Sequence, residues 1–185
     1  MIKREAEGLR RTLDKLGDAE SFAAIWATLA PDADTDTDDA ETQDTLAAAE
    51  RHCQEIVEAA QEAFDYTEAE AVDRQLVPRH DKDMPGKEWW DAAISMRIVA
   101  EVHGAGENPG RWRRLALYGH LDHAQVPTWN ELARLRQLFS HDYGDADFQE
   151  GREVHAIMER ILTSLPEIIR GLVDWRDMVW PPEET

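Results

Sequence analysis

An arginine and a histidine close together in the sequence, Arg136 and His141, could do chemistry on an anionic substrate. Imidazole titrates near neutral pH, so His141 could accept or release a proton. Arg136 lies four residues after Leu132 and three before Phe139, which places it at the edge of a predicted buried stripe. A guanidinium at such an edge needs an anion or a carbonyl as its partner, because burying it unpaired is costly.

The spacing of these two residues limits how they could act together. In an ideal helix His141 lies about 140° around the axis from Arg136. Both can face one pocket only if the helix ends or distorts near Ser140, or if the pocket spans two subunits.

A structural interpretation of Arg136 and His141 stays open beside the catalytic one. Arg136 then pairs with a nearby carboxylate such as Asp142 or Asp145, and His141 stabilises the C-terminus of a helix, where a cation is favoured.

Residues 135–165 resemble the HEPN superfamily, and within it the HepT-like toxins and the related helical partners of minimal nucleotidyltransferases. The resemblance rests on Arg136-x4-His141-x-Tyr143 at the end of a helix, followed by an acidic turn and a final amphipathic helix that ends in Leu-Pro. The helix predicted over 46–66 matches the long packing helix of that family more loosely. The residue after the arginine is Gln137, where the family usually has Asn or Asp.

The resemblance implies a fold and a function. The fold is an all-α antiparallel helical bundle with an extended middle region, assembled as a homodimer that pairs the motif helices across its axis. The function is metal-independent RNA endonuclease activity, as the toxin of a toxin–antitoxin pair. Arg136 and His141 would be catalytic, and Gln137 and Asp142 would support them. Tyr143 occupies the position that a nucleotidyltransferase-type antitoxin modifies with AMP.

A second function stays open, in which the same fold is a non-catalytic helical adaptor. The formal net charge is −19, from 39 acidic and 20 basic residues. This charge repels nucleic acid at long range and argues against a nonspecific DNA or RNA coat, and no DNA partner is expected. The acidity is either a solvated, salt-adapted surface or an attraction for a basic partner, and the adaptor hypothesis takes the latter.

Arg111, Arg113 and Arg114 form the only concentrated basic cluster of the sequence. They are candidates for an RNA or partner contact, or else part of a solvated face that balances the surrounding acid. Three tryptophans of the middle region could stack on bases, but their helical spacing favours a place in the core. These are Trp89, Trp90 and Trp112.

Neither a metal nor another cofactor is expected. His120-x-x-His123, with Asp122 between, could place two imidazoles on one helix face. Both histidines lie near a predicted helix end, however, and the Glu-x-x-His pairs of a di-iron bundle are missing. Cys53 is the only cysteine, which excludes an intramolecular disulfide and a cysteine zinc site.

The hydrophobic pattern predicts helices throughout a single domain spanning 1–185. Helices are expected over 3–16, 46–66, 89–102 and 112–121, with an acidic exposed loop at 32–41 and a mixed stretch at 67–85. A motif helix and a C-terminal amphipathic helix are expected within 128–176. No export signal and no membrane-spanning run is visible in the sequence, so a cytoplasmic location is expected.

Two capping boxes refine the last third of the chain. Thr128-x-x-Glu131 predicts that the motif helix begins at Thr128, because the two side chains would bond the first free backbone amides. Ser164-x-x-Glu167 is a second capping box inside the C-terminal helix, and Pro166 lies within it. A kink or a new helix start is therefore expected there.

Overall fold

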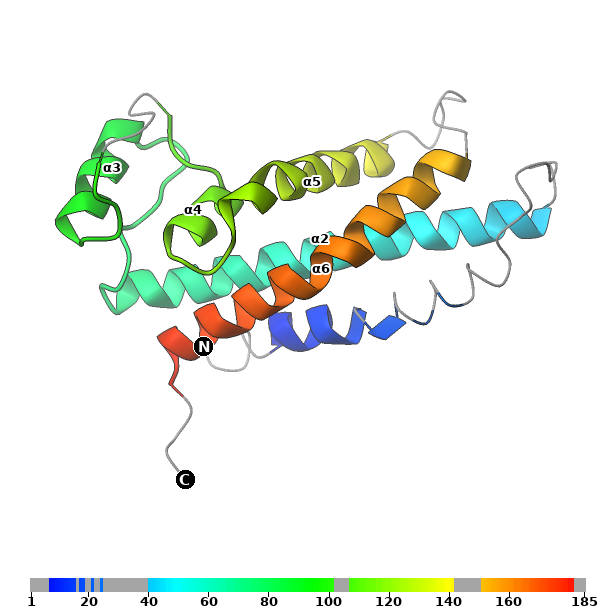
Figure 1. The fold of residues 1–185 in the computed structure, drawn as a ribbon, viewed down its shortest axis with the longest axis horizontal. Helices are drawn as coiled ribbons and strands as arrows, with labels where there is room; N and C mark the ends of the chain where they lie inside the picture. The colour runs from blue at the N-terminus through cyan, green and yellow to red at the C-terminus, as the bar shows by residue number, and fades with distance from the viewer. Residues whose placement is uncertain are drawn as a thin grey trace.

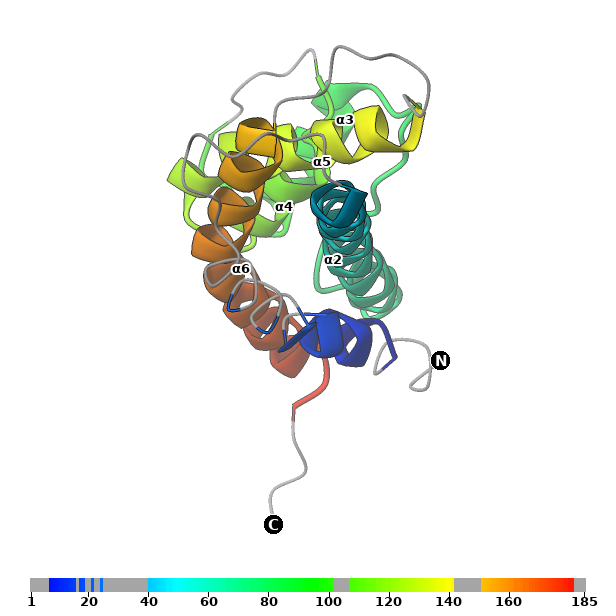
Figure 2. The same cartoon turned by 90° about the vertical axis from the view of Figure 1, so that its right-hand side faces the viewer.

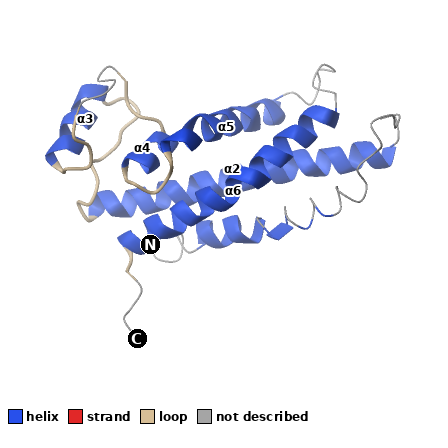
Figure 3. Ribbon diagram, viewed as in Figure 1, coloured by secondary structure: helices blue, strands red, loops and turns tan. Residues whose placement is uncertain are grey.

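The computed structural model describes residues 7–15, 17–18, 21, 24, 40–101, 107–141 and 151–181. For residues 40–50, 52–53, 135–141, 151–159 and 161–162 it describes the backbone alone. Every regular element in these ranges is a helix, and none of them contains a strand (Figure 3), which confirms the all-α prediction. The elements are α2 (Ala40–Asp73), α3 (Gly86–Ser95), α4 (Arg111–Leu117), the 3-10 helix η1 (His123–Gln125), α5 (Val126–His141) and α6 (Gly151–Val179).

Four helical segments form the bundle, and successive ones run in opposite directions (Figure 1). They are the helical residues 7–15, α2, α5 and α6. Seen from one end, α5, α6, residues 7–15 and α2 follow one another around the bundle (Figure 2). The short helices α3 and α4 lie together at one end, where α2 finishes. Of the acidic loop expected at 32–41, residues 32–39 lie outside the described residues, and 40–41 already belong to α2.

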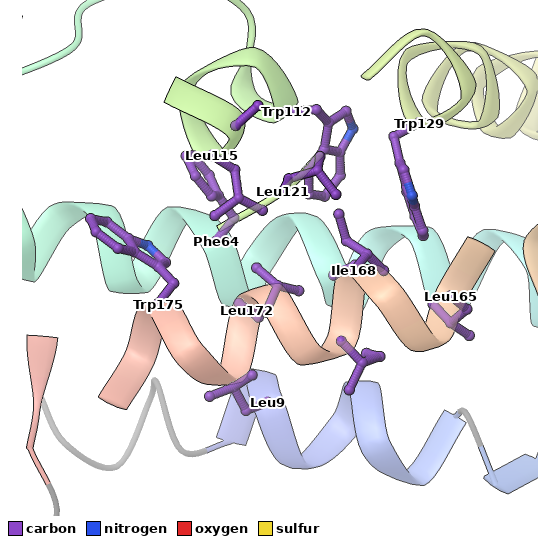
Figure 4. Packing of buried hydrophobic residues seen from close by; sticks show 14 of the residues in the cluster. Leu9, Phe64, Trp112, Leu115, Leu121, Trp129, Leu165, Ile168, Leu172 and Trp175 are labelled. Atoms are coloured by element: carbon purple, nitrogen blue, oxygen red, sulfur yellow. The ribbon is translucent and has the colours of Figure 1, made fainter. Parts of the chain in front are cut away.

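A continuous aromatic core joins α2, α4, α5 and α6 (Figure 4). The Trp112 ring lies 6.2 Å from that of Phe64 and 5.3 Å from that of Trp129, between centroids. On α6, Trp175 stacks on Tyr118 at 4.9 Å. The predicted core tryptophans are confirmed, since Trp112 and the α3 pair Trp89 and Trp90 are all buried.

Three helices end in the same hydrogen-bonded turn. After α2 the amide of Leu76 bonds the Ala71 carbonyl at 2.8 Å, and Gln75 takes φ +61°. After α3 the amide of Ile98 bonds the Ala93 carbonyl at 2.9 Å, and Arg97 takes φ +61°. This is the Schellman arrangement, which usually places glycine at the left-handed residue. Only α4 follows that preference, because Gly119 is its left-handed residue (φ +86°).

These turns shift the helix boundaries away from the sequence prediction. Helix α2 runs on to Asp73, through residues expected to be mixed, and α3 ends at Ser95 instead of continuing to 102. Glutamine and arginine at the left-handed positions give no local stop signal. The boundaries therefore follow from burial, which places the residues after each turn, Val77 and Ile98, against the core.

The predicted start of the motif helix at Thr128 is wrong, because α5 begins two residues earlier, at Val126. The 3-10 helix η1 leads directly into α5, and Asp122 caps η1 by accepting the Ala124 amide at 2.9 Å. Thr128 therefore lies inside α5. Glu131 pairs with Arg160 of α6, with two hydrogen bonds of 3.0 and 2.6 Å, so a contact between helices replaces the local cap.

Helix α6 continues through Pro166, and the expected restart at residues 164–167 does not occur. Proline removes one helical hydrogen bond. Pro166 faces solvent, whereas Leu165 and Ile168 on either side of it are buried. We attribute the continuity of the helix to this burial. Among the helices that the structure describes, none is long and apolar enough to cross a membrane.

Gly171 marks the closest approach between α6 and the turn after α4. A Cβ atom built there would lie 1.9 Å from the carbonyl oxygen of His120, which is backbone and cannot swing away. Any larger side chain must push the two segments apart. The absence of a side chain at 171 thus allows Trp175, one turn later, to reach Tyr118.

We predict that Gly171→Ala lowers the free energy of unfolding by about 2–3 kcal/mol, as expected for an overpacked contact. Gly17→Ala is the matched control, since nothing lies within 4 Å of a Cβ there and residue 17 is helical. Alanine is the better helix former, so the control should be neutral or slightly stabilising. Urea unfolding followed by circular dichroism measures both variants. Equal stability of the two would contradict the close approach.

Candidate functional site

Three of the five predicted motif residues, Arg136, Gln137 and His141, lie in the last part of α5. The helix is continuous through Arg136 and Gln137 and ends at His141, and the structure describes the backbone of these residues without their side chains. The two others, Asp142 and Tyr143, lie outside the described residues. The motif is thus located at the C-terminal end of a helix, and the prediction of its chemistry stays a prediction.

The first half of α5 is firmly packed and holds the helix in place. Trp129 and Leu132 are buried against the aromatic core. On another side of the helix, Glu131 forms its two hydrogen bonds with Arg160. These hydrogen bonds first, and the opposite charges second, raise the pKa of Arg160 and lower that of Glu131. The direction of α5 relative to α6 is therefore set before the helix reaches the motif.

The most elaborate polar network in the described residues lies at the other end of the bundle, between α2 and α4. Arg114 donates from Nε and Nη2 to the two carboxylate oxygens of Glu68, at 2.7 Å each, and from Nη1 to the Pro109 carbonyl at 2.8 Å. The Tyr118 hydroxyl also donates to Glu68, at 2.8 Å. Burial and the neighbouring Glu68 carboxylate raise the pKa of Tyr118, so it stays protonated.

The arginine cluster does not form one exposed basic patch. Arg114 keeps only 5% of its side chain exposed. Arg111 donates two bonds of 2.7 Å to Asp65 of α2, which raise its pKa. Arg113 lies over the Trp90 ring, 5.3 Å from its centre, in a cation–π contact. The cluster therefore balances acid and joins helices, but it is not the solvated face considered as the alternative, because Arg114 is buried.

A surface pocket of about 790 Å³ opens beside this network. One wall is a stripe of α2 from Asp65 to Asp73, another is the turn 108–111, and the third is the loop 79–82. Asn108 holds the last two walls together by donating to the carbonyls of Asp81 and Met84. This loop carries none of the motifs from which a site was predicted. Its run of Arg79, His80 and Lys82 next to Pro78 was the available signal.

His80 lines this pocket and is half-buried. Its pKa is lowered, first because burial penalises the charged imidazolium and second because Arg114 carries a positive charge nearby. The ring is thus kept neutral near pH 7. A neutral imidazole among cations can accept a hydrogen bond or contact an anionic ligand.

The histidines considered for a metal site are not brought together. The His120 ring packs 5.2 Å from that of Trp175, and its Nε2 has no hydrogen-bond partner among the described residues. His123 is exposed on η1, and Asp122 is used as the cap of that helix. Across the described ranges, no three histidine, cysteine or acidic side chains gather into a group that could hold a metal ion.

We predict that Glu68→Gln lowers the free energy of unfolding by about 3 kcal/mol, because it leaves the buried Arg114 charge uncompensated. Asp65→Asn removes the equivalent carboxylate from the half-exposed pair with Arg111 and should cost less than about 1 kcal/mol. Both variants remove one negative charge from α2 and differ in the burial of the partner. Urea unfolding at one pH compares them, and equal losses would refute the structural role of the buried pair.

We predict that His120 makes the protein less stable as pH falls below about 6.5. Burial lowers the pKa of His120 in the folded state, against an attraction from Asp174. The unfolded chain therefore gains a proton that the folded chain resists, and stability drops as pH falls from the unfolded towards the folded pKa. His120→Gln should flatten this part of the curve of unfolding free energy against pH. His123→Gln, which removes an exposed histidine from the same segment, is the matched control, and a larger change in the control than in His120→Gln would refute the assignment.

Comparison of the chain with family models, with curated proteins and with solved structures found no match.

Proposed function

We propose that this protein is a HepT-like, metal-independent RNA endonuclease that acts in the cytoplasm as the toxin of a toxin–antitoxin pair. The motif of Arg136, His141 and Tyr143 and its resemblance to the HEPN superfamily are the starting point. Two structural facts support the proposal. The chain is a helical bundle, and a long final helix, α6, follows the motif helix.

The extent of α5 is the observation that carries the proposal. The helix includes Arg136 and has His141 as its last residue, so an arginine within the helix and a histidine at its end have the order that the resemblance implies. Position 136 comes one turn after the buried Leu132, and position 141 lies about 140° further around the axis. One copy of a regular helix does not point both residues at one phosphate. We therefore propose a homodimer that pairs the α5 helices and completes the site.

The proposed reaction is cleavage by the 2′-hydroxyl of the RNA itself. His141 accepts the hydroxyl proton, the oxygen attacks the adjacent phosphorus, and the bond to the 5′ oxygen of the next nucleotide breaks. A second copy of His141 returns a proton to that leaving oxygen. The products are a 2′,3′-cyclic phosphate and a 5′-hydroxyl. Arg136 binds the phosphate and stabilises the charge that develops on it.

The remaining motif residues have supporting roles in this proposal. Gln137 and Asp142 flank the catalytic pair and position it. Tyr143 would be modified with AMP by a nucleotidyltransferase-type antitoxin. The adduct places a bulky anion two residues from His141, where it repels the RNA phosphate and silences the site.

We predict that the purified protein cleaves a mixed RNA substrate in the presence of EDTA. Arg136→Ala and His141→Ala should each lower the rate by about 10² or more, because they remove charge stabilisation and proton transfer. Arg134→Ala is the matched control, an exposed arginine on the same helix with no place in the proposed site. Circular dichroism verifies that all variants fold, and growth of expressing cells provides a second readout.

Intact RNA with the wild-type protein, or equal activity of all three variants, would reject the ribonuclease. The helical adaptor would then be the better hypothesis, with its acidic surface bound to a basic partner. The internal use of Arg111 and Arg114 favours this second candidate, because it leaves less positive charge on the surface for RNA.

A further inference from the structure

The pocket between α2, the loop 79–82 and the turn 108–111 is separate from the α5 motif. It lies at the end of the bundle where α2 finishes and α4 begins, whereas α5 ends at the opposite end (Figure 1). Its volume of about 790 Å³ is in the range of pockets that bind small molecules. A function of this pocket would thus be additional to RNA cleavage.

Basic residues outnumber acidic ones in the lining of the pocket, whereas acidic residues outnumber basic ones in the whole chain. The whole chain has 20 basic and 39 acidic residues. The pocket lining has more basic residues than acidic ones: Arg79, Lys82, Arg111 and Arg114 against Asp65, Glu68 and Asp73. Against an acidic background, a local excess of cations selects for an anionic ligand.

The ion pairs determine which of these cations a ligand could use. Arg114 has all three nitrogens bonded within the protein. Arg111 gives Nε and Nη2 to Asp65, and its Nη1 has no partner among the described residues. Arg79 and Lys82 are exposed, and no described carboxylate pairs with either. Counting only partners among the described residues, two whole cations and one guanidinium nitrogen of the lining are therefore available, and Asp73 is the one lining carboxylate without an ion pair to them.

The rest of the lining is suited to the uncharged part of a ligand. Ala69 and Val72 of α2 and Pro109 of the opposite wall provide apolar surface. The neutral His80 ring adds a flat face and a hydrogen-bonding nitrogen. A compound with an anionic group and a mostly apolar or aromatic body would use both parts of the pocket.

We propose that this pocket binds a small phosphate monoester, with the phosphate held by Arg79, Lys82 and Nη1 of Arg111. A phosphate monoester carries a charge of about −1.5 to −2 near neutral pH and has three acceptor oxygens, which match two cations and a third donor. A carboxylate has one charge and two oxygens and would leave part of this set unused. Val72 and Pro109 contact the body of the ligand.

Inorganic phosphate is the probe for the anion subsite, with acetate at equal ionic strength as the comparison. The ring proton signals of His80, observed by NMR, report on the pocket, and those of His123 report on a surface outside it. We expect phosphate to shift the His80 signals saturably, without shifting those of His123, and acetate to bind at least about tenfold more weakly.

Two double variants, each of which removes two positive charges, test where the phosphate binds. Arg79→Gln with Lys82→Gln should weaken phosphate binding about tenfold or more, since charge-assisted hydrogen bonds are lost. Arg134→Gln with Arg170→Gln removes two exposed cations outside the pocket and should leave the Kd within about twofold. Asp65→Asn should act in the opposite direction and tighten binding, because it releases two nitrogens of Arg111.

Phosphate binding in this pocket does not depend on the proposed ribonuclease site. His141→Ala should therefore bind phosphate as the wild-type protein does. A lack of any saturable His80 shift would overturn the proposal, as would an equal Kd in the two double variants. Equal affinity for acetate would overturn the assignment to phosphate.

Discussion

A buried ion pair between Glu68 on α2 and Arg114 on α4 is the contact that fixes α4, the short helix whose side chains enter the aromatic core shared by the other helices. Taking both charges out of water is expensive, and the cost is offset only while the two groups keep their hydrogen bonds. The planar guanidinium fits the carboxylate with two parallel bonds of 2.7 Å, so both the distance and the rotation of α4 are fixed. Trp112 and Leu115 on the same short helix then enter the core, and Tyr118 stacks on Trp175 of α6.

Other arginines of this acidic protein also contact a neighbouring helix. Arg111 joins α4 to α2 through Asp65, and Arg160 joins α6 to α5 through Glu131. At the end of α2, Arg74 donates to the Val179 carbonyl and lies over the Trp180 ring. Among the described residues of this chain of net −19, several basic side chains thus join one helix to another. Arg79 and Lys82 at the pocket are not used in this way, since no described carboxylate pairs with either.

The two proposed sites differ in how the fold supports them. The pocket is built from three segments that ion pairs and Asn108 hold together, so its shape depends on tertiary contacts. The α5 motif is carried by one helix, whose direction is fixed by buried Trp129 and Leu132 before the motif begins. The sequence could name Arg136 and His141 because a local spacing identifies them. It could not connect Arg79 with Arg111, since no local pattern relates residues so far apart.

The sequence by itself determined that the described part of the chain is helical and, in the second half of α2, which residues face inward. Apolar side chains three and four apart, such as Ile56, Ala60 and Phe64, are buried as their period requires, because helical periodicity is a local property. Tertiary structure alone decided where helices end and which charges pair. Gln75 and Arg97 adopt left-handed conformations without being glycine, and Arg114 finds Glu68 at a separation of 46 residues. Such choices depend on the free energy of packing distant segments together, which outweighs the modest preferences of single residues.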